Sequence, residues 1–133
     1  MSTGYLLDTS ALAAHFLRRP GDRFVADCVR KGGAVCALSL FEFAQFLKRQ
    51  GLDQTASAEM WGLYRAALTA VHPVDEAVAD LAVQLRSQAA DRLPLADACI
   101  AACAARHGLT LLHGDSHYAA LPASVEAIDI RTV

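Results

Sequence analysis

The chain has 133 residues, a formal net charge of −2 at pH 7 and a hydrophobic fraction of 54%. This length suits one domain with a real core, so we expect a single domain over residues 1–133. The slight negative charge argues against a general nucleic-acid coat protein, and no apolar stretch reaches the roughly 18 residues that span a membrane. The first residues lack the basic and apolar regions of a secretory signal, so we expect a cytoplasmic protein.

Strand-like and helix-like segments alternate along the chain. The first half contains expected strands at 4–8, 34–39 and 70–74, and expected helices at 9–18, 22–31, 40–50 and 54–69. The second half contains expected helices at 76–90 and 95–107, a strand at 109–113, a short helical turn at 116–120 and a strand at 125–129. Strands separated by helices favour a parallel sheet covered on both faces. The expected fold class is therefore α/β, with three layers.

The four cysteines show neither C-x-x-C spacing nor the density of a disulfide scaffold, so buried thiols are expected. They are Cys28, Cys36, Cys99 and Cys103. Cys99, Cys103 and His107 repeat every four residues on one expected helix, which leaves a zinc site open as an alternative. The surrounding stretch is ACIAACAARHG, in which cysteine also packs as a small apolar residue.

Four acidic residues stand where expected strands end or helices begin. Asp8 ends the first strand, Asp115 lies just beyond the strand at 109–113, and Glu42 and Asp97 lie in the first turns of their expected helices. Ligands of parallel α/β sheets collect outside the carboxyl ends of the strands, so these acids are expected on one rim, Asp97 only if its helix also begins there. Ordinary roles as helix caps, first-turn acids or turn residues remain open for each of them.

The neighbours of these acids favour partial burial rather than a solvent-facing cap. Asp97 shares a helical face with Ile100 and Ala104, and Phe43 follows Glu42 directly. Carboxylates that converge in a partly buried cleft resist ionisation unless a cation neutralises them. Mg²⁺ and Mn²⁺ prefer carboxylate and water oxygens, and such ions polarise phosphoryl oxygens and acidify bound water. The sequence thus predicts a divalent-metal site suited to phosphodiester hydrolysis.

Three segments, YLLDTSAL, SLFEFAQ and LPLADACIAACAARHGLTLLHGD, stand in an order and spacing that resembles the PIN-domain ribonucleases, especially the VapC toxins of bacterial VapBC modules. The resemblance covers nearly the whole chain. It implies a PIN-like α/β/α fold with a central parallel sheet of four or five strands, usually in a homodimer. It also implies that Asp8, Glu42, Asp97 and Asp115 are the catalytic residues and bind one or two Mg²⁺ or Mn²⁺ ions, with Ser10 as the accompanying hydroxyl.

Two positions depart from the pattern of these ribonucleases. His113 stands where threonine is common, two residues before the last acid, and His117 stands where a further Asp or Asn often follows. These histidines could orient water or phosphate, bind Mn²⁺, or be loop residues without a role. They are not assigned as primary ligands.

The resemblance implies a metal-dependent endoribonuclease that cuts single-stranded or looped RNA and acts as the toxin of a type II toxin–antitoxin system. The implied partner is a VapB-like antitoxin whose C-terminal segment lies across the acidic groove, which suits a basic side chain. Lys48 and Arg49 are candidates for contacts with the RNA backbone.

Three other functions compete with the ribonuclease. A phospho-acceptor receiver module wants paired acids after the first strand and a late lysine, but Asp8 has no acidic neighbour and no lysine follows Lys48. A phosphatase with an aspartate nucleophile needs a second acid where Ser10 stands. A PIN-like domain with a binding or regulatory role and no nuclease activity remains the alternative.

Overall fold

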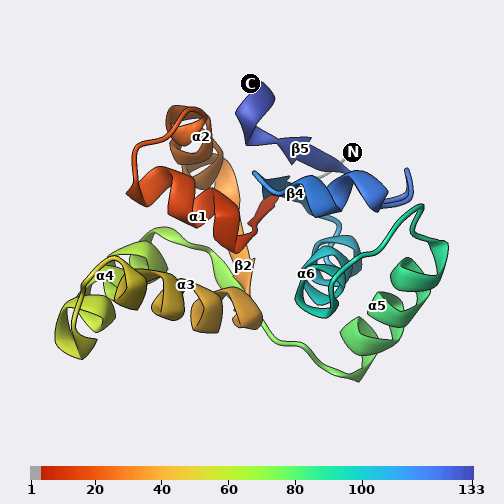
Figure 1. The fold of residues 1–133 in the computed structure, drawn as a ribbon, viewed down its shortest axis with the longest axis horizontal. Helices are drawn as coiled ribbons and strands as arrows, with labels where there is room; N and C mark the ends of the chain where they lie inside the picture. The colour runs from red at the N-terminus through yellow and green to blue at the C-terminus, as the bar shows by residue number, and fades with distance from the viewer. Residues whose placement is uncertain (1–3) are drawn as a thin grey trace.

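The structure is a computed structural model and describes residues 4–133. Five parallel strands form one sheet in the order β3-β2-β1-β4-β5 (Figure 1). The strands are β1 (Tyr5–Leu7), β2 (Gly33–Cys36), β3 (Ala70–His72), β4 (Thr110–His113) and β5 (Ala127–Asp129). The expectation of a three-layer α/β fold around a parallel sheet is confirmed.

Six α-helices and two short 3-10 helices connect and cover the strands. They are α1 (Thr9–Phe16), α2 (Asp22–Gly32), α3 (Ala37–Arg49), α4 (Gln54–Ala67), α5 (Glu76–Gln88), α6 (Leu95–Arg106), η1 (Ser116–Ala120) and η2 (Ile130–Thr132). Figure 1 shows α1 to α4 on one side of the sheet and α5 and α6 on the other. Among the helices of residues 4–133, none combines the length and apolar character that a membrane crossing requires.

Alternating strand residues feed two separate cores, because successive side chains of a strand point to opposite faces of the sheet. Leu6 and Leu111 are paired neighbours on β1 and β4 and pack in the core on the side of α5 and α6. Leu7 and Leu112 are the next pair and pack against α1, α2 and α3. All four side chains are fully buried, so the two central strands firmly support the loops at their carboxyl ends.

The second strand is shorter than expected from the sequence. The strand expected at 34–39 ends at Cys36, and the helix expected from residue 40 already begins at Ala37. The reason is a buried helical stripe in which Ser39, Phe43 and Leu47 recur every four residues. Glu42 therefore lies in the second turn of α3, and its expected place in the first turn is wrong.

Candidate active site

Asp8 combines a helix-capping role with an unusual degree of burial. It follows β1 directly, where its N–H donates to Leu112 O over 3.0 Å, and its carboxylate accepts a hydrogen bond from Ser10 N as the N-cap of α1. The residue is only 4% exposed. Burial raises the pKa of Asp8 to about 6, against the opposing effect of hydrogen bonds from Tyr118 and Ser10. The carboxylate thus resists ionisation although it caps a helix.

Asp97 has the most perturbed carboxylate of the four predicted acids. It lies in the first turn of α6, whose N-cap is Pro94, so no capping bond occupies its side chain. The side chain is 13% exposed, and its Oδ2 atom is buried without a hydrogen-bond partner. Burial, followed by the charges of Asp115 and Asp8, raises the pKa of Asp97 to about 7. A buried carboxylate oxygen that makes no hydrogen bond is a candidate ligand for a cation.

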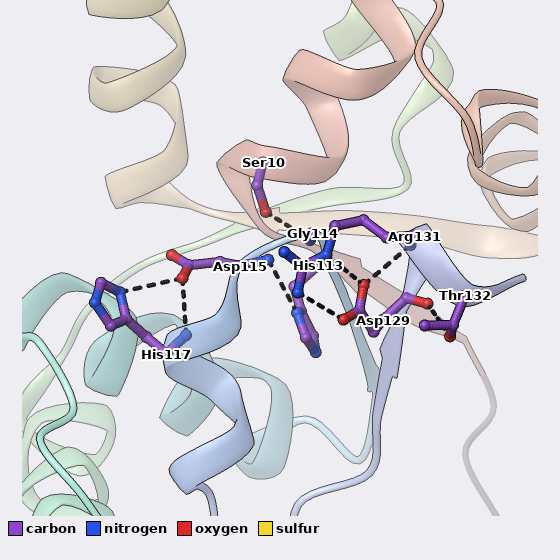
Figure 2. Close-up of polar contacts among 8 residues, drawn as sticks. All are labelled: Ser10, His113, Gly114, Asp115, His117, Asp129, Arg131 and Thr132. Carbon is purple, nitrogen blue, oxygen red and sulfur yellow. Dashed lines mark hydrogen bonds and ion pairs between the residues drawn. The ribbon is translucent and has the colours of Figure 1, made fainter.

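Asp115 and His117 complete a compact cluster with Asp97. Asp115 begins η1 and accepts a hydrogen bond from His117 N over 2.9 Å. His117 Nδ1 lies 3.1 Å from Asp115 Oδ1 and 3.2 Å from Asp97 Oδ2, and Figure 2 shows the imidazole turned toward Asp115. One ligand atom from each of the three residues lies within 4.8 Å of the others. His117, whose role the sequence left open, therefore faces both carboxylates.

Glu42 stands at the margin of the cluster. Its Oε1 atom accepts a hydrogen bond from Thr9 Oγ1 over 2.7 Å, which links α3 to the start of α1. The charge of Glu42 also contributes to the raised pKa of Asp97, although less than the charges of Asp8 and Asp115 do. Sequence reasoning missed Thr9, because the two residues of this pair are far apart in the chain. The sequence signal that could have pointed to Thr9 is its place between Asp8 and Ser10.

Ser10 ties two loops of the site together. Its Oγ atom accepts a hydrogen bond from Gly114 N over 2.8 Å, as Figure 2 shows, and a hydrogen bond from its side chain lowers the pKa of Asp8. The hydroxyl thus fixes the segment after β4, which carries Asp115, against the first turn of α1. Its role beside a bound ion stays a prediction.

His113 does not join the cluster. It ends β4 with 6% exposure, and burial lowers its pKa, which favours the neutral form of the ring. Its Nδ1 atom accepts a hydrogen bond from Asp115 N over 3.3 Å, and its ring lies 4.8 Å from the ring of Tyr118. These contacts make His113 a support of the loop that carries Asp115.

The alternative zinc site on α6 finds no support. Among residues 4–133, three ligand atoms converge only at Asp97, Asp115 and His117. All four cysteines are free and buried, as expected. The ring of His107 instead stacks on that of His72 at 3.7 Å.

The chemistry of the acidic cluster suits a divalent metal ion. The charge of Asp115 opposes the ionisation of both Asp8 and Asp97, and the charge of Asp8 also opposes that of Asp97. A bound cation would favour the ionised carboxylates and so lower their pKa values. The same cation would also supply a ligand contact for the buried Oδ2 of Asp97. Carboxylate oxygens with one imidazole nitrogen form a donor set that Mg²⁺ accepts through oxygen and Mn²⁺ through both atom types.

Comparison with known proteins places this geometry in a family. The PIN domain model matches residues 5–123. Three solved structures share the fold. A toxin–antitoxin complex from Klebsiella pneumoniae has 20% identity, a TM-score of 0.75 and coverage of 96% of this chain and 98% of that chain. FitAcB from Neisseria gonorrhoeae has 23% identity, a TM-score of 0.76 and coverage of 97% and 99%. FitAB bound to an IR36 DNA fragment has 26% identity, a TM-score of 0.72 and coverage of 97% and 96%.

The comparison with curated proteins gives no match. The matched segment nevertheless includes every strand except β5 and all four predicted acids. The resemblance found in the sequence is thus confirmed at the level of the family model and of the fold. The chain belongs to the PIN domain family.

Proposed function

We propose that this protein is a divalent-metal-dependent endoribonuclease and the toxin of a type II toxin–antitoxin pair. The observation that carries the proposal is the convergence of Asp8, Asp97 and Asp115 at the carboxyl ends of β1 and β4, with a buried oxygen on Asp97 that faces His117 but makes no hydrogen bond. The active sites of open α/β sheets lie at this edge. Membership of the PIN domain family supports phosphodiester cleavage as the chemistry.

The proposed activity assigns a separate role to each residue of the site. Asp8, Asp97 and Asp115 would hold Mg²⁺ or Mn²⁺, with His117 as an additional ligand, and the ion would supply charge stabilisation at the phosphate and an acidified water. Because burial keeps the pKa of Asp8 and Asp97 high, metal binding near neutral pH releases protons from the cluster.

Glu42 stands beside this group with Thr9 holding one of its oxygens. Its carboxylate is therefore oriented, and it can accept a hydrogen bond from the attacking water without moving. Lys48 and Arg49 lie in the last turn of α3, about 9 to 11 Å farther along the helix axis than Glu42. They remain predicted contacts for the RNA backbone.

A VapB-like antitoxin is the proposed partner. The similar proteins from Klebsiella pneumoniae and Salmonella typhimurium are described as a toxin–antitoxin complex and as DNA-bound VapBC. This chain offers an apolar groove of about 400 Å³, lined by residues of α1, α2 and α4 that include Leu12, Val25, Met60 and Leu63. An apolar helix of an antitoxin fits such a groove, because helix-in-groove recognition uses anchors at helical spacing. A homodimer stays a prediction.

Cleavage of RNA by the purified full-length chain tests the enzymatic proposal. A fluorescent single-stranded RNA pool is incubated with Mg²⁺, with Mn²⁺ or with EDTA, and the cleavage ends are sequenced. We expect defined ends with either metal, none with EDTA, and none with Asp8→Asn or Asp115→Asn. Asp80→Asn, at an exposed position of α5, is the matched control and should cleave normally.

Two outcomes would count against the proposal. If the protein binds RNA but does not cleave it under any metal condition, the alternative of a binding or regulatory PIN-like domain is favoured. Full cleavage by Asp8→Asn would show that the acidic cluster is not the active site.

The toxin role has its own test, which is co-expression with the neighbouring open reading frame. Co-expression should yield a complex and relieve growth arrest. A chain that is harmless alone and co-purifies with no product would contradict the toxin role.

A further inference from the structure

Arg131 brings a guanidinium to the same edge of the sheet as the acidic cluster, although the proposed function gives it no role. β4 and β5 are parallel neighbours, and His113 is the register partner of Asp129. Asp115 and Arg131 each stand two residues beyond a member of that pair. Because the carboxyl ends of parallel strands share one edge of the sheet, both charged residues follow neighbouring strands on the side where ligands bind.

The side chain of Arg131 lies against the loop that carries Asp115. A Cβ atom added to Gly114 would lie 3.7 Å from Arg131 Cγ and 3.9 Å from Arg131 Cδ, so the aliphatic part of the arginine covers this glycine. On its other side, Gly114 N donates to Ser10 Oγ over 2.8 Å. Figure 2 shows the arginine side chain running from η2 back across Gly114. The guanidinium is therefore a neighbour of the acidic site on the side of β5.

Asp129 holds this guanidinium in one direction. Its carboxylate accepts hydrogen bonds from Arg131 Nε over 2.9 Å and from Arg131 Nη2 over 2.7 Å, which makes a bidentate pair. The backbone of this segment is fixed as well, because Ile130 is buried in the core and Thr132 Oγ1 donates to Asp129 O over 2.8 Å. The arginine is thus positioned before any ligand arrives, which lowers the entropy that binding costs.

The guanidinium keeps N–H donors for a ligand. An arginine has five N–H groups, and the pair with Asp129 engages only Nε and Nη2. In the part of the chain that the structure describes, no other acceptor takes a hydrogen bond from this guanidinium. The side chain is 52% exposed, so a ligand can reach the remaining donors. A planar fork of N–H groups matches the oxygens of a phosphate.

We infer that Arg131 is an RNA-binding residue, whose guanidinium donates to a backbone phosphate on the β5 side of the acidic cluster while Asp129 holds it in place. The inference rests on the proposed function, because it takes the acidic cluster as the point where the RNA strand is cut. The competing role is an ion pair that only fastens the C-terminal segment, and exposed ion pairs of this kind contribute little to stability.

Arg131→Gln separates the two roles, because it removes the charge and the fork at an exposed position. Binding of a fluorescent single-stranded RNA is measured by anisotropy in EDTA at a series of salt concentrations. We expect the RNA to bind about tenfold more weakly. The slope of log K against log salt should become shallower by about 0.7, which is the value for one phosphate contact on a single strand. In Mg²⁺, KM should rise by a similar factor with kcat nearly unchanged.

Two further variants sharpen the test. Arg131→Lys keeps the charge and loses the fork, so it should retain the wild-type salt dependence with an affinity between those of the wild type and Arg131→Gln. Arg106→Gln is the matched control, because it removes an exposed arginine at the end of α6, ahead of the amino end of β4, and should bind RNA like the wild type. Wild-type affinity and salt dependence in Arg131→Gln would overturn the inference.

The failure of the proposed function would look different. If the wild type binds RNA but cleaves none with either metal, the nuclease proposal fails, while the affinities of the arginine variants still decide the role of Arg131. If the wild type neither binds nor cleaves RNA, both proposals fall. If the wild type cleaves RNA and Arg131→Gln binds and cleaves it equally well, only the role of Arg131 is lost.

Discussion

Replacing Asp97 by asparagine should stabilise the metal-free protein, although it removes a residue of the proposed active site. Burial and neighbouring charges raise the pKa of Asp97 from 3.8 to about 7 in the folded chain. At about 1.4 kcal/mol for each pH unit, ionising this carboxyl in the folded state costs about 4 kcal/mol. Its side chain is 13% exposed, so solvent screens part of this cost. We expect Asp97→Asn to recover about 2 to 3 kcal/mol of unfolding free energy.

The pH dependence follows from the direction of the shift. Between pH 3.8 and about 7 the folded state binds more protons at Asp97 than the unfolded state does, so wild-type stability falls as the pH rises through this window. Asparagine does not titrate. The gain in unfolding free energy of Asp97→Asn over the wild type should therefore be negligible below pH 3.8 and complete above about pH 7.

Urea unfolding in EDTA, at a series of pH values that spans this window, measures the difference directly. Asp80→Asn, an exposed acid on α5, serves as the control and should show no comparable pH-dependent gain. Addition of Mg²⁺ at high pH should stabilise the wild type far more than Asp97→Asn, because the variant lacks the ligand. A variant less stable than the wild type at high pH in EDTA would refute the electrostatic reasoning.

Substitutions at three further positions test other parts of the structure. Thr9→Val removes the hydrogen bond to Glu42 and should lower kcat for RNA cleavage about tenfold. Thr9→Ser keeps the hydroxyl and should cleave at nearly the wild-type rate. Equal rates for the two variants would contradict the orienting role of Thr9. His117→Ala should weaken Mn²⁺ binding more than Mg²⁺ binding in calorimetric titrations, because the imidazole suits Mn²⁺ better, and unchanged affinities would exclude it as a ligand. Gly21→Ala should lower the unfolding free energy by more than about 1 kcal/mol, since Gly21 has φ +95° and a Cβ would collide with the carbonyl of Ile130; an unchanged thermal midpoint would speak against this contact.

Much of the fold followed from the sequence because its signals are local. Apolar runs such as LTLL alternate with helical patterns, and this alternation alone leads to a covered parallel sheet. The beginning of α3 was misjudged because residues 37–39 are apolar or small and continue the preceding apolar run. Only the burial of Ser39, Phe43 and Leu47 on one face reveals that the helix has already begun.

The site was predictable to the extent that it depends on the ends of strands. Asp8 and Asp115 follow β1 and β4, which are adjacent and parallel, so their proximity follows from topology. Side-chain direction does not follow from topology. His117 faces Asp97 because η1 turns it back over α6, and Thr9 reaches Glu42 because α1 and α3 pack together. These contacts join segments that only the folded structure brings together.

The place of β1 at the middle of the sheet has a consequence for biosynthesis. Of the five described strands β1 is translated first, yet one of its two neighbours, β4, is translated about a hundred residues later. Contacts between such distant segments form late in folding. The nascent polypeptide therefore carries Asp8 without the carboxylates of α6 and the β4 loop for most of its synthesis. The proposed metal site therefore cannot assemble before β4 and the loop that follows it have emerged from the ribosome.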